Sequence, residues 1–143
     1  PDSLPATVRF PLVSVATMAK PGNGIGTCMQ VVLNRYYKMI TEIRIYKLKE
    51  NTASAFYKVF AEQSLPMMKR WKVNVVDYGF SLIDKDSFYL IRRYENLEHR
   101  KENQGAFYGS KEWINGPEKA IMDCIDTYNT VIVDSDKLII HNK

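Results

Sequence analysis

The sequence has little cysteine and little histidine. Of its 143 residues, two are histidines and two are cysteines, Cys28 and Cys124, and the cysteines form no Cys-x-x-Cys motif. This spacing does not predict a disulfide framework or a zinc site, and we expect neither a metal nor a cofactor. Because Asn-x-Ser/Thr glycosylation sites are also missing, we expect a reducing, cytoplasmic location.

Long apolar runs and low-complexity segments are missing as well. No stretch approaches the roughly 18 consecutive apolar residues of a transmembrane helix, so no membrane span is expected. Seven glycines, six prolines, 45% hydrophobic and 25% charged residues exclude a collagen-like or wholly disordered chain. The length fits one globular domain, since domains commonly have about 100–200 residues.

Residues 1–40 differ in composition from the remainder. They hold four basic residues and one acidic residue, and so carry most of the net charge of +4. The basic residues are too scattered for a nucleic-acid-binding arm, and the glycines at 22–26 lack the spacing of a phosphate-binding loop. We therefore expect residues 1–40 to be a basic, poorly packed or non-native extension and residues 41–143 to be the domain, with no nucleic-acid partner.

Hydrophobic periodicity predicts strands and helices in residues 41–143. The predicted elements are a strand at 41–48, a helix through Phe56 and Trp71 that breaks near Pro66, strands at 73–83 and 88–94, a helix at 97–108, a helix from Pro117 to Ile125 and a strand at 127–133. This β-α-β-β-α-β order is that of a ferredoxin-like α+β fold, whose antiparallel sheet carries helices on one face. The other face then needs a cover, and a twofold homodimer supplies it.

Alternation along the first strand separates a charged face from an apolar one, which holds Ile43 and Ile45. We expect the apolar face to meet the helices and the charged face to be the open one. The residues expected on the open face are Glu42, Arg44, Tyr46, Arg92 and Tyr94. Because Phe88 and Leu90 share the parity of Arg92, the face of that arginine stays undecided at this point.

Several short segments of the domain resemble the NIPSNAP family. The segments are Thr41–Leu48, Ser64–Pro66, Ile91–Arg92, Glu98–Arg100 and the run from Ala106 to Trp113 that reads AFYGSKEW. The similarity covers roughly residues 41–134 and implies a dimeric α+β barrel. It implies no particular reaction, since related barrels include cofactor-independent oxygenases, haem-degrading enzymes and proteins without known catalysis. Arg93 departs from the family pattern, so it stays open which of Arg92 and Arg93 faces the barrel interior.

The candidate site lies on the charged residues of the first and third strands. A buried arginine requires a carboxylate, so Glu42 is expected to pair with Arg44 or Arg92. In the functional interpretation, an arginine binds an anionic or enolate oxygen and Tyr46 donates a hydrogen bond. In the structural interpretation, the same ion pair holds the dimer seam. The candidate ligand-binding residues are Glu42, Arg44, Tyr46, Arg92, Tyr94 and Trp113, the last as either pocket wall or core.

The candidates for catalysis are Tyr46 and His99. His99 would act as a base oriented by Glu95 or Glu102, or would lie on a solvated helix face. One hypothesis is a small-molecule site between sheet and helices, with cofactor-independent oxygenase or isomerase activity. The alternative is a non-catalytic homodimeric assembly or ligand-binding module. A polar cavity beside Arg44 and Tyr46 favours the first, and a closed glutamate–arginine network favours the second.

Overall fold

The computed structural model describes residues 38–138. Residues 1–37, which include Cys28, and residues 139–143 lie outside this part. The expected character of residues 1–40 and the domain boundary therefore stay predictions. None of the described helices is long and apolar enough to cross a membrane. The cytoplasmic location expected from the sequence also stays a prediction.

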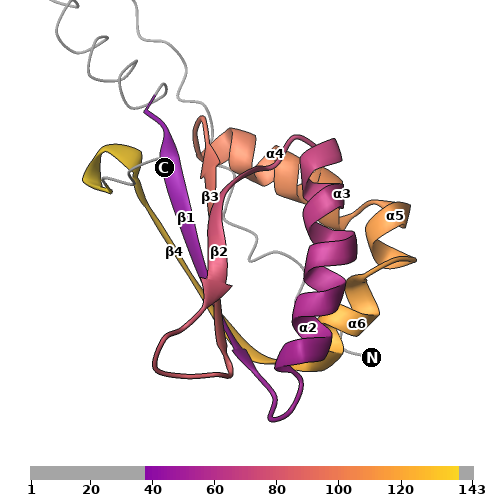
Figure 1. Ribbon diagram of the computed structural model, residues 1–143. Helices are drawn as coiled ribbons and strands as arrows, with labels where there is room; N and C mark the ends of the chain where they lie inside the picture. Colours follow the sequence, from indigo (N-terminus) through magenta and orange to yellow (C-terminus); the bar gives the residue numbers. More distant parts are fainter. Residues whose placement is uncertain (1–37, 139–143) are drawn as a thin grey trace, which may run out of the picture.

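Four strands form one antiparallel sheet, and the helices of the described residues cover one of its faces (Figure 1). The strands are β1 (Ile40–Leu48), β2 (Asn74–Phe80), β3 (Ser87–Tyr94) and β4 (Ile125–Asp134). Their order across the sheet is β2-β3-β1-β4, so β1 and β3 occupy the centre. The predicted β-α-β-β-α-β order and the antiparallel sheet are confirmed.

The first helical segment changes its winding where the sequence predicted a break. Its parts are α2 (Ala53–Val59), the π-helical turn η1 (Phe60–Ser64) and α3 (Leu65–Arg70). The N–H of Leu65 donates to the carbonyl of Phe60, five residues back. Pro66 has no N–H to donate, and it lies in the first turn of α3, where none is needed. Such wide turns are frequent at functional sites, and this one brings Phe60 and Ser64 to the pocket described below.

Three further helices lie on the same face of the sheet, and side-chain caps begin two of them. They are α4 (Leu97–Tyr108), α5 (Lys111–Ile114) and α6 (Glu118–Cys124), followed after β4 by the short 3-10 turn η2 (Ser135–Lys137). The Asn96 side chain accepts the N–H of His99 and begins α4, while the Ser110 hydroxyl accepts the N–H of Trp113 and begins α5. These side-chain caps fix where α4 starts and how Trp113 enters the core.

Aromatic side chains fill the space between the sheet and α2. Phe88 of β3 lies at the centre, with ring centroids 5.1 Å from Phe56, 5.1 Å from Phe60 and 5.0 Å from Phe80. Edge-to-face contacts of this kind add to the free energy of burial, which is about 1.5–3 kcal/mol for a phenylalanine. The cluster therefore holds the first helical segment rigidly on β3.

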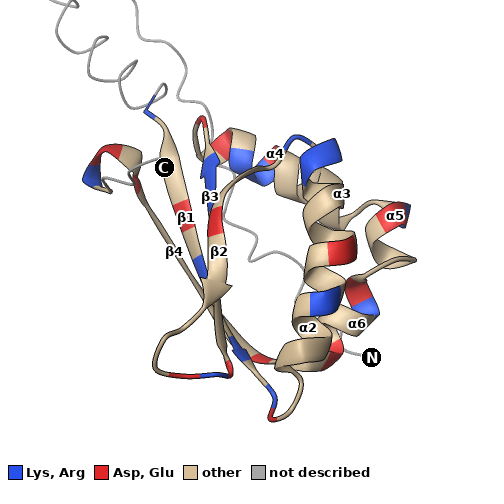
Figure 2. Cartoon of the chain, in the orientation of Figure 1, with Lys and Arg blue, Asp and Glu red and all other residues tan. Residues whose placement is uncertain are grey.

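The predicted assignment of faces on β1 was wrong. Glu42 and Tyr46 are buried under the helices, whereas Ile45 is 50% exposed on the opposite face. Arg92 shares the helix-covered face and is fully buried, and Arg93 lies on the other face of β3. Figure 2 shows the acidic and basic segments close together on β1. Alternation determines which residues share a face, but here the buried charges find partners on α4, which the strand pattern does not reveal.

Candidate functional site

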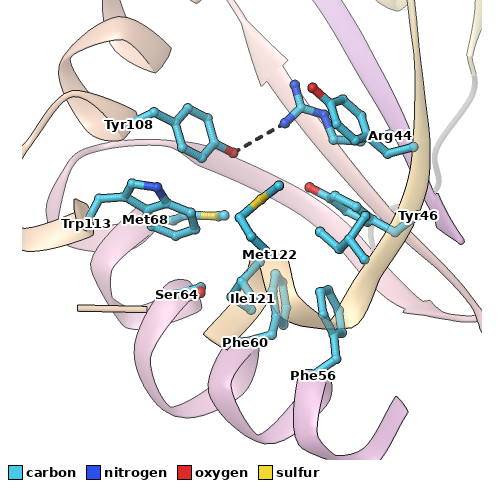
Figure 3. Close-up of a pocket in the computed structure, with 12 residues that line it drawn as sticks. Arg44, Tyr46, Phe56, Phe60, Ser64, Met68, Tyr108, Trp113, Ile121 and Met122 are labelled. Atoms are coloured by element: carbon cyan, nitrogen blue, oxygen red, sulfur yellow. Dashed lines mark hydrogen bonds between the residues drawn. The ribbon is translucent and has the colours of Figure 1, made fainter. Parts of the chain in front are cut away.

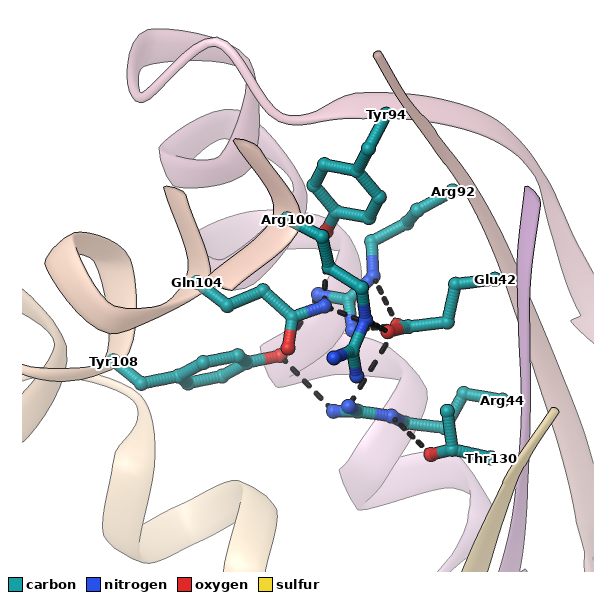
Figure 4. A network of polar contacts seen from close by, with 8 residues as sticks. All are labelled: Glu42, Arg44, Arg92, Tyr94, Arg100, Gln104, Tyr108 and Thr130. Atoms are coloured by element: carbon teal, nitrogen blue, oxygen red, sulfur yellow. Dashed lines mark hydrogen bonds and ion pairs between the residues drawn. The ribbon is translucent and has the colours of Figure 1, made fainter. Parts of the chain in front are cut away.

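A buried carboxylate stands at the centre of a polar cluster (Figure 4). The Glu42 side chain is fully buried and accepts hydrogen bonds from Arg92 Nε at 3.1 Å and from Arg92 Nη2. Its other oxygen accepts from Arg100 Nε and from Gln104 Nε2 at 2.8 Å. Arg44 Nη2 lies 3.6 Å from Glu42 Oε1. The expected pairing of Glu42 with Arg92 is thus present, and Arg44 joins it from the same strand.

Sheet register and helix periodicity bring this cluster together. Glu42 and Arg92 are directly opposed on the antiparallel strands β1 and β3. Arg100, Gln104 and Tyr108 follow one another at four-residue spacing along α4, so their side chains share the face that packs toward the sheet. None of these three residues was among the site residues predicted from the sequence. Their spacing on a predicted helix was the signal that could have found them.

Positive charge exceeds negative charge in this cluster. Glu42 is the single carboxylate that pairs with Arg44, Arg92 and Arg100 among the described residues. Burial alone would raise the pKa of Glu42, but the charges of Arg92, Arg44 and Arg100 overcome that effect and lower it from 4.5 to about 2. Arginine does not lose its proton in proteins, so two positive charges stay uncompensated beside the helices.

Tyr108 lies between two of the arginines. Its hydroxyl oxygen accepts hydrogen bonds from Arg92 Nη1 at 2.9 Å and from Arg44 Nη1 at 3.4 Å. Arg44 is held from the other side by Thr130, whose hydroxyl oxygen accepts from Arg44 Nε at 3.2 Å. Burial by itself would raise the pKa of Tyr108, but the charges of Arg92 and Arg44 and the hydrogen bond from Arg92 lower it. The phenol is therefore easier to ionise than an ordinary tyrosine.

A cavity opens beside Arg44 and Tyr108, between the sheet and the helices (Figure 3). Its volume of about 30 Å³ exceeds the roughly 10–15 Å³ that one water molecule needs, and the surrounding space, including its mouth, is about 430 Å³. The aromatic and aliphatic part of its wall includes Tyr46, Phe56, Phe60, Met68, Ile121 and Met122. The cavity is thus polar at the arginine end and apolar along its length.

Two residues of the cavity wall carry a buried polar atom without a partner. Ser64 Oγ and Trp113 Nε1 are buried, and neither forms a hydrogen bond within the described part of the chain. Unpartnered buried donors and acceptors cost about 1–3 kcal/mol each, so native proteins rarely leave them so. Neither atom is accessible to water in this structure, so a side-chain shift would have to precede any hydrogen bond to a bound molecule.

The structure separates the predicted site residues into three groups. Arg44, Tyr46 and Trp113 line the cavity. Glu42, Arg92 and Tyr94 belong to the polar cluster behind it, where the Tyr94 hydroxyl accepts from Gln104 at 3.0 Å. His99 joins neither group: its Nδ1 accepts the N–H of Glu95 at 3.2 Å, and its ring packs edge-on against Tyr94. A cavity that is apolar except at its arginine end therefore lies beside a glutamate–arginine network, and this arrangement does not decide between the two interpretations.

The fold and this cluster define the class of the protein as a ferredoxin-like α+β domain. The NIPSNAP family model matches residues 41–132, most of the chain, and the chain belongs to the NIPSNAP family. The resemblance seen in the sequence is confirmed.

Solved structures agree with this assignment. An uncharacterized NIPSNAP-like domain protein from Burkholderia xenovorans has a TM-score of 0.63 at 23% identity, over 68% of this chain and 84% of that one. A NIPSNAP family protein with unknown function from Agrobacterium tumefaciens has a TM-score of 0.64 at 25% identity, over 69% of this chain and 89% of that one. A Nitrosomonas europaea protein that carries the name of an antibiotic biosynthesis monooxygenase has a TM-score of 0.53 at 15% identity, over 68% and 89%, which shows a shared fold alone. No curated protein matches the chain.

Proposed function

We propose that this NIPSNAP domain binds a small organic anion in the cavity between the sheet and the helices. The observation that carries this proposal is the excess of positive charge at one end of an otherwise apolar cavity. A buried guanidinium without a full counter-charge is costly, and a ligand carboxylate or enolate oxygen would compensate it. The volume of about 30 Å³ is far below the roughly 150 Å³ of an apolar cavity that holds benzene, so the body of a ring-sized ligand would extend along the apolar wall into the open mouth.

Arg44 is the arginine that we assign to the ligand. Arg92 and Arg100 donate directly to Glu42, whereas the Arg44–Glu42 separation of 3.6 Å is longer than a hydrogen bond. The Arg44 side chain is 11% exposed and lines the cavity, but that of Arg92 is not exposed at all. Arg44 is therefore the arginine whose charge is not fully paired and whose side chain lines the cavity. Tyr46 forms the wall beside it and would orient the ligand.

The far part of the cavity supports a second polar group on the ligand. Ser64 and Trp113 both belong to the wall of the cavity, and their buried Oγ and Nε1 atoms have no partner among the described residues. A hydroxyl or carbonyl opposite the anionic group would satisfy them. We therefore propose a ligand that is anionic at one end, apolar in the middle and polar, but uncharged, at the other end.

The cavity holds its own reporters for a binding experiment. The side chains of Met68 and Met122 line it, whereas Met67 is buried elsewhere in the core. In the methionine-methyl NMR spectrum of the full chain, benzoate should shift the Met68 and Met122 signals and leave that of Met67 in place. Benzamide has nearly the same shape without the charge. We expect it to bind at least roughly tenfold more weakly, because a hydrogen bond to a charged group contributes about 1.5–3 kcal/mol.

The matched variant is Arg44→Met, which keeps the aliphatic stem and removes the charge. It should bind benzoate and benzamide about equally while keeping the methyl spectrum of a folded protein. A variant that still prefers benzoate by tenfold would contradict the assignment of Arg44. Equal binding of both probes by the wild-type protein would contradict the anionic ligand itself.

We also propose that the protein is a homodimer joined through the open face of the sheet. On this face Ile43 is paired with Ile91 and with Val131, and Ile45 and Val131 are 50% and 56% exposed. A contiguous apolar sheet face of this kind needs a cover, and a second copy provides a self-complementary one. Native mass spectrometry should report a dimer, and Val131→Asp should convert it to a monomer. A wild-type monomer would contradict the covered-sheet proposal and would leave the cavity proposal to its own test.

A further inference from the structure

We propose that Tyr108 is the proton acceptor of this cavity, taking a proton from an acidic C–H or O–H group of the bound molecule. The proposal rests on the proposed function, because it requires a ligand in the cavity. It adds a reaction class, proton transfer within an organic anion, which needs no metal or redox cofactor.

The geometry around the phenol oxygen favours its ionised form. Arg92 Nη1 and Arg44 Nη1 both donate to this one oxygen, at 2.9 Å and 3.4 Å. A phenolate accepts two charged donors better than a phenol does, because its oxygen carries the full negative charge. The Arg92 guanidinium also lies 5.9 Å from the centroid of the Tyr108 ring. Tyr108 and Arg44 both line the cavity, so the proposal expects the phenol oxygen between them to be reached by a ligand.

The charges that face Tyr108 come from three elements. Arg92 of β3 and Arg44 of β1 favour its ionisation, and Glu42 of β1 opposes it. Arg100 of α4 donates to Glu42, and its positive charge reduces the effect of the Glu42 charge on the ionisation of Tyr108. The balance lowers the pKa of Tyr108 below its ordinary value.

The two other tyrosines of the cluster behave in the opposite way. For Tyr46 and for Tyr94, burial is the largest effect and the pKa is raised. Neither hydroxyl has two arginine donors aimed at it as Tyr108 has. Tyr108 is thus distinguished from its neighbours by geometry as well as by direction of shift.

The proton-transfer step balances without a further reactant. The C–H bond of a ligand carbon next to a carbonyl breaks, and its electron pair remains on the ligand as an enolate. The proton forms the O–H bond of Tyr108, and the Arg44 guanidinium hydrogen-bonds the enolate oxygen. If the Tyr108 O–H exchanges its proton with solvent before reprotonating the same carbon, the ligand incorporates solvent hydrogen; protonation of another atom gives isomerisation.

The ionisation of Tyr108 can be measured without any ligand. In the full chain labelled with ¹³C at tyrosine Cζ, one resonance should titrate with a midpoint below the ordinary tyrosine value of about 10. That resonance should vanish in Tyr108→Phe and persist in Tyr89→Phe, whose hydroxyl donates to Asp77 at 3.1 Å outside the cavity. In Arg44→Met its midpoint should rise. A Tyr108 resonance that titrates at or above 10 in the wild-type protein would overturn the proposal.

The transfer itself is tested with phenylpyruvate, an aromatic anion with an acidic CH₂ group. In D₂O, the wild-type protein should accelerate the loss of the benzylic proton signals, and Tyr108→Phe should lose roughly a hundredfold or more of that acceleration. The Met122 methyl shift reports binding in the same samples. Binding with equal exchange rates in wild type and Tyr108→Phe would overturn the role of Tyr108 and leave the proposed function intact. Absence of the Met122 shift in the wild type would contradict the proposed function instead, and the tyrosine titration would still decide the state of Tyr108.

Discussion

Replacement of Glu42 by glutamine removes the one negative charge of the polar cluster. Glutamine has nearly the same size and keeps one oxygen acceptor, so the packing of β1 against α4 changes little. The variant leaves the guanidinium groups of Arg44, Arg92 and Arg100 without a carboxylate partner among the described residues. We therefore expect Glu42→Gln to lose stability through charge and not through volume.

The size of the loss follows from the pKa of Glu42. That pKa falls from 4.5 to about 2, after the arginine charges have overcome the opposing effect of burial. Each pKa unit corresponds to about 1.4 kcal/mol, so the ionised carboxylate contributes about 3 kcal/mol to the free energy of unfolding. Loss of one partner of a buried ion pair commonly costs about 3–5 kcal/mol, which agrees with this figure.

The lowered pKa of Glu42 also predicts how the free energy of unfolding changes with pH. A carboxyl group with a lowered pKa stabilises the fold fully above pH 4.5, and this stabilisation is lost as the pH falls through about 2. Urea unfolding at fixed protein concentration should therefore show a loss of stability in the wild type below pH 4.5 that is much reduced in Glu42→Gln. At pH 7 the variant should be less stable by about 3 kcal/mol.

The matched control is Glu112→Gln. Glu112 accepts from Arg70 and from Trp71 Nε1 at 2.9 Å, but its side chain is 43% exposed, so its loss should change the free energy of unfolding much less. A Glu42→Gln protein within about 1 kcal/mol of wild type at pH 7 would show that Glu42 contributes no more than an exposed ion pair.

Three substitutions test the helical layer by urea unfolding. Gly105→Ala should stabilise the protein by about 0.5–1 kcal/mol, because Gly105 is an interior position of α4 and no atom is near the new methyl group. A loss of stability would show that α4 is not continuous there. Gly116→Ala should destabilise it by about 1–3 kcal/mol, because the methyl group would clash with the Glu112 carbonyl oxygen, and a neutral result would show that the turn after α5 adjusts freely. Ser110→Ala removes the hydroxyl that accepts the Trp113 N–H at 3.1 Å and should cost about 1 kcal/mol, with a change in tryptophan fluorescence that an intact cap would not give.

The order of elements could be predicted from the sequence because it depends on local periodicity. Alternation marked β1, and the missing N–H of Pro66 marked the restart of α3 at Leu65. The π-helical turn before it could not be foreseen, since a widened turn has the same apolar spacing as a regular one. The short helix α5 escaped prediction because its four residues carry no repeat.

The candidate site was predicted in composition but not in position. Glu42, Arg44 and Arg92 were found because unusual charges in strands demand partners. Their direction was predicted wrongly, because aliphatic residues normally mark the buried face and here they mark the face that we propose to meet a second copy. Tyr108 was not among the predicted site residues, since nothing local shows that its hydroxyl meets arginines from β1 and β3.

The proposed function requires Arg44 to hold an anionic ligand in the cavity. A crystal structure of the full chain with 4-bromobenzoate tests it directly, because anomalous scattering locates the bromine without ambiguity. We expect a carboxylate within hydrogen-bond distance of the Arg44 guanidinium and a bromine peak along the apolar wall of the cavity. A bromine peak elsewhere, or a carboxylate turned away from Arg44, would contradict it.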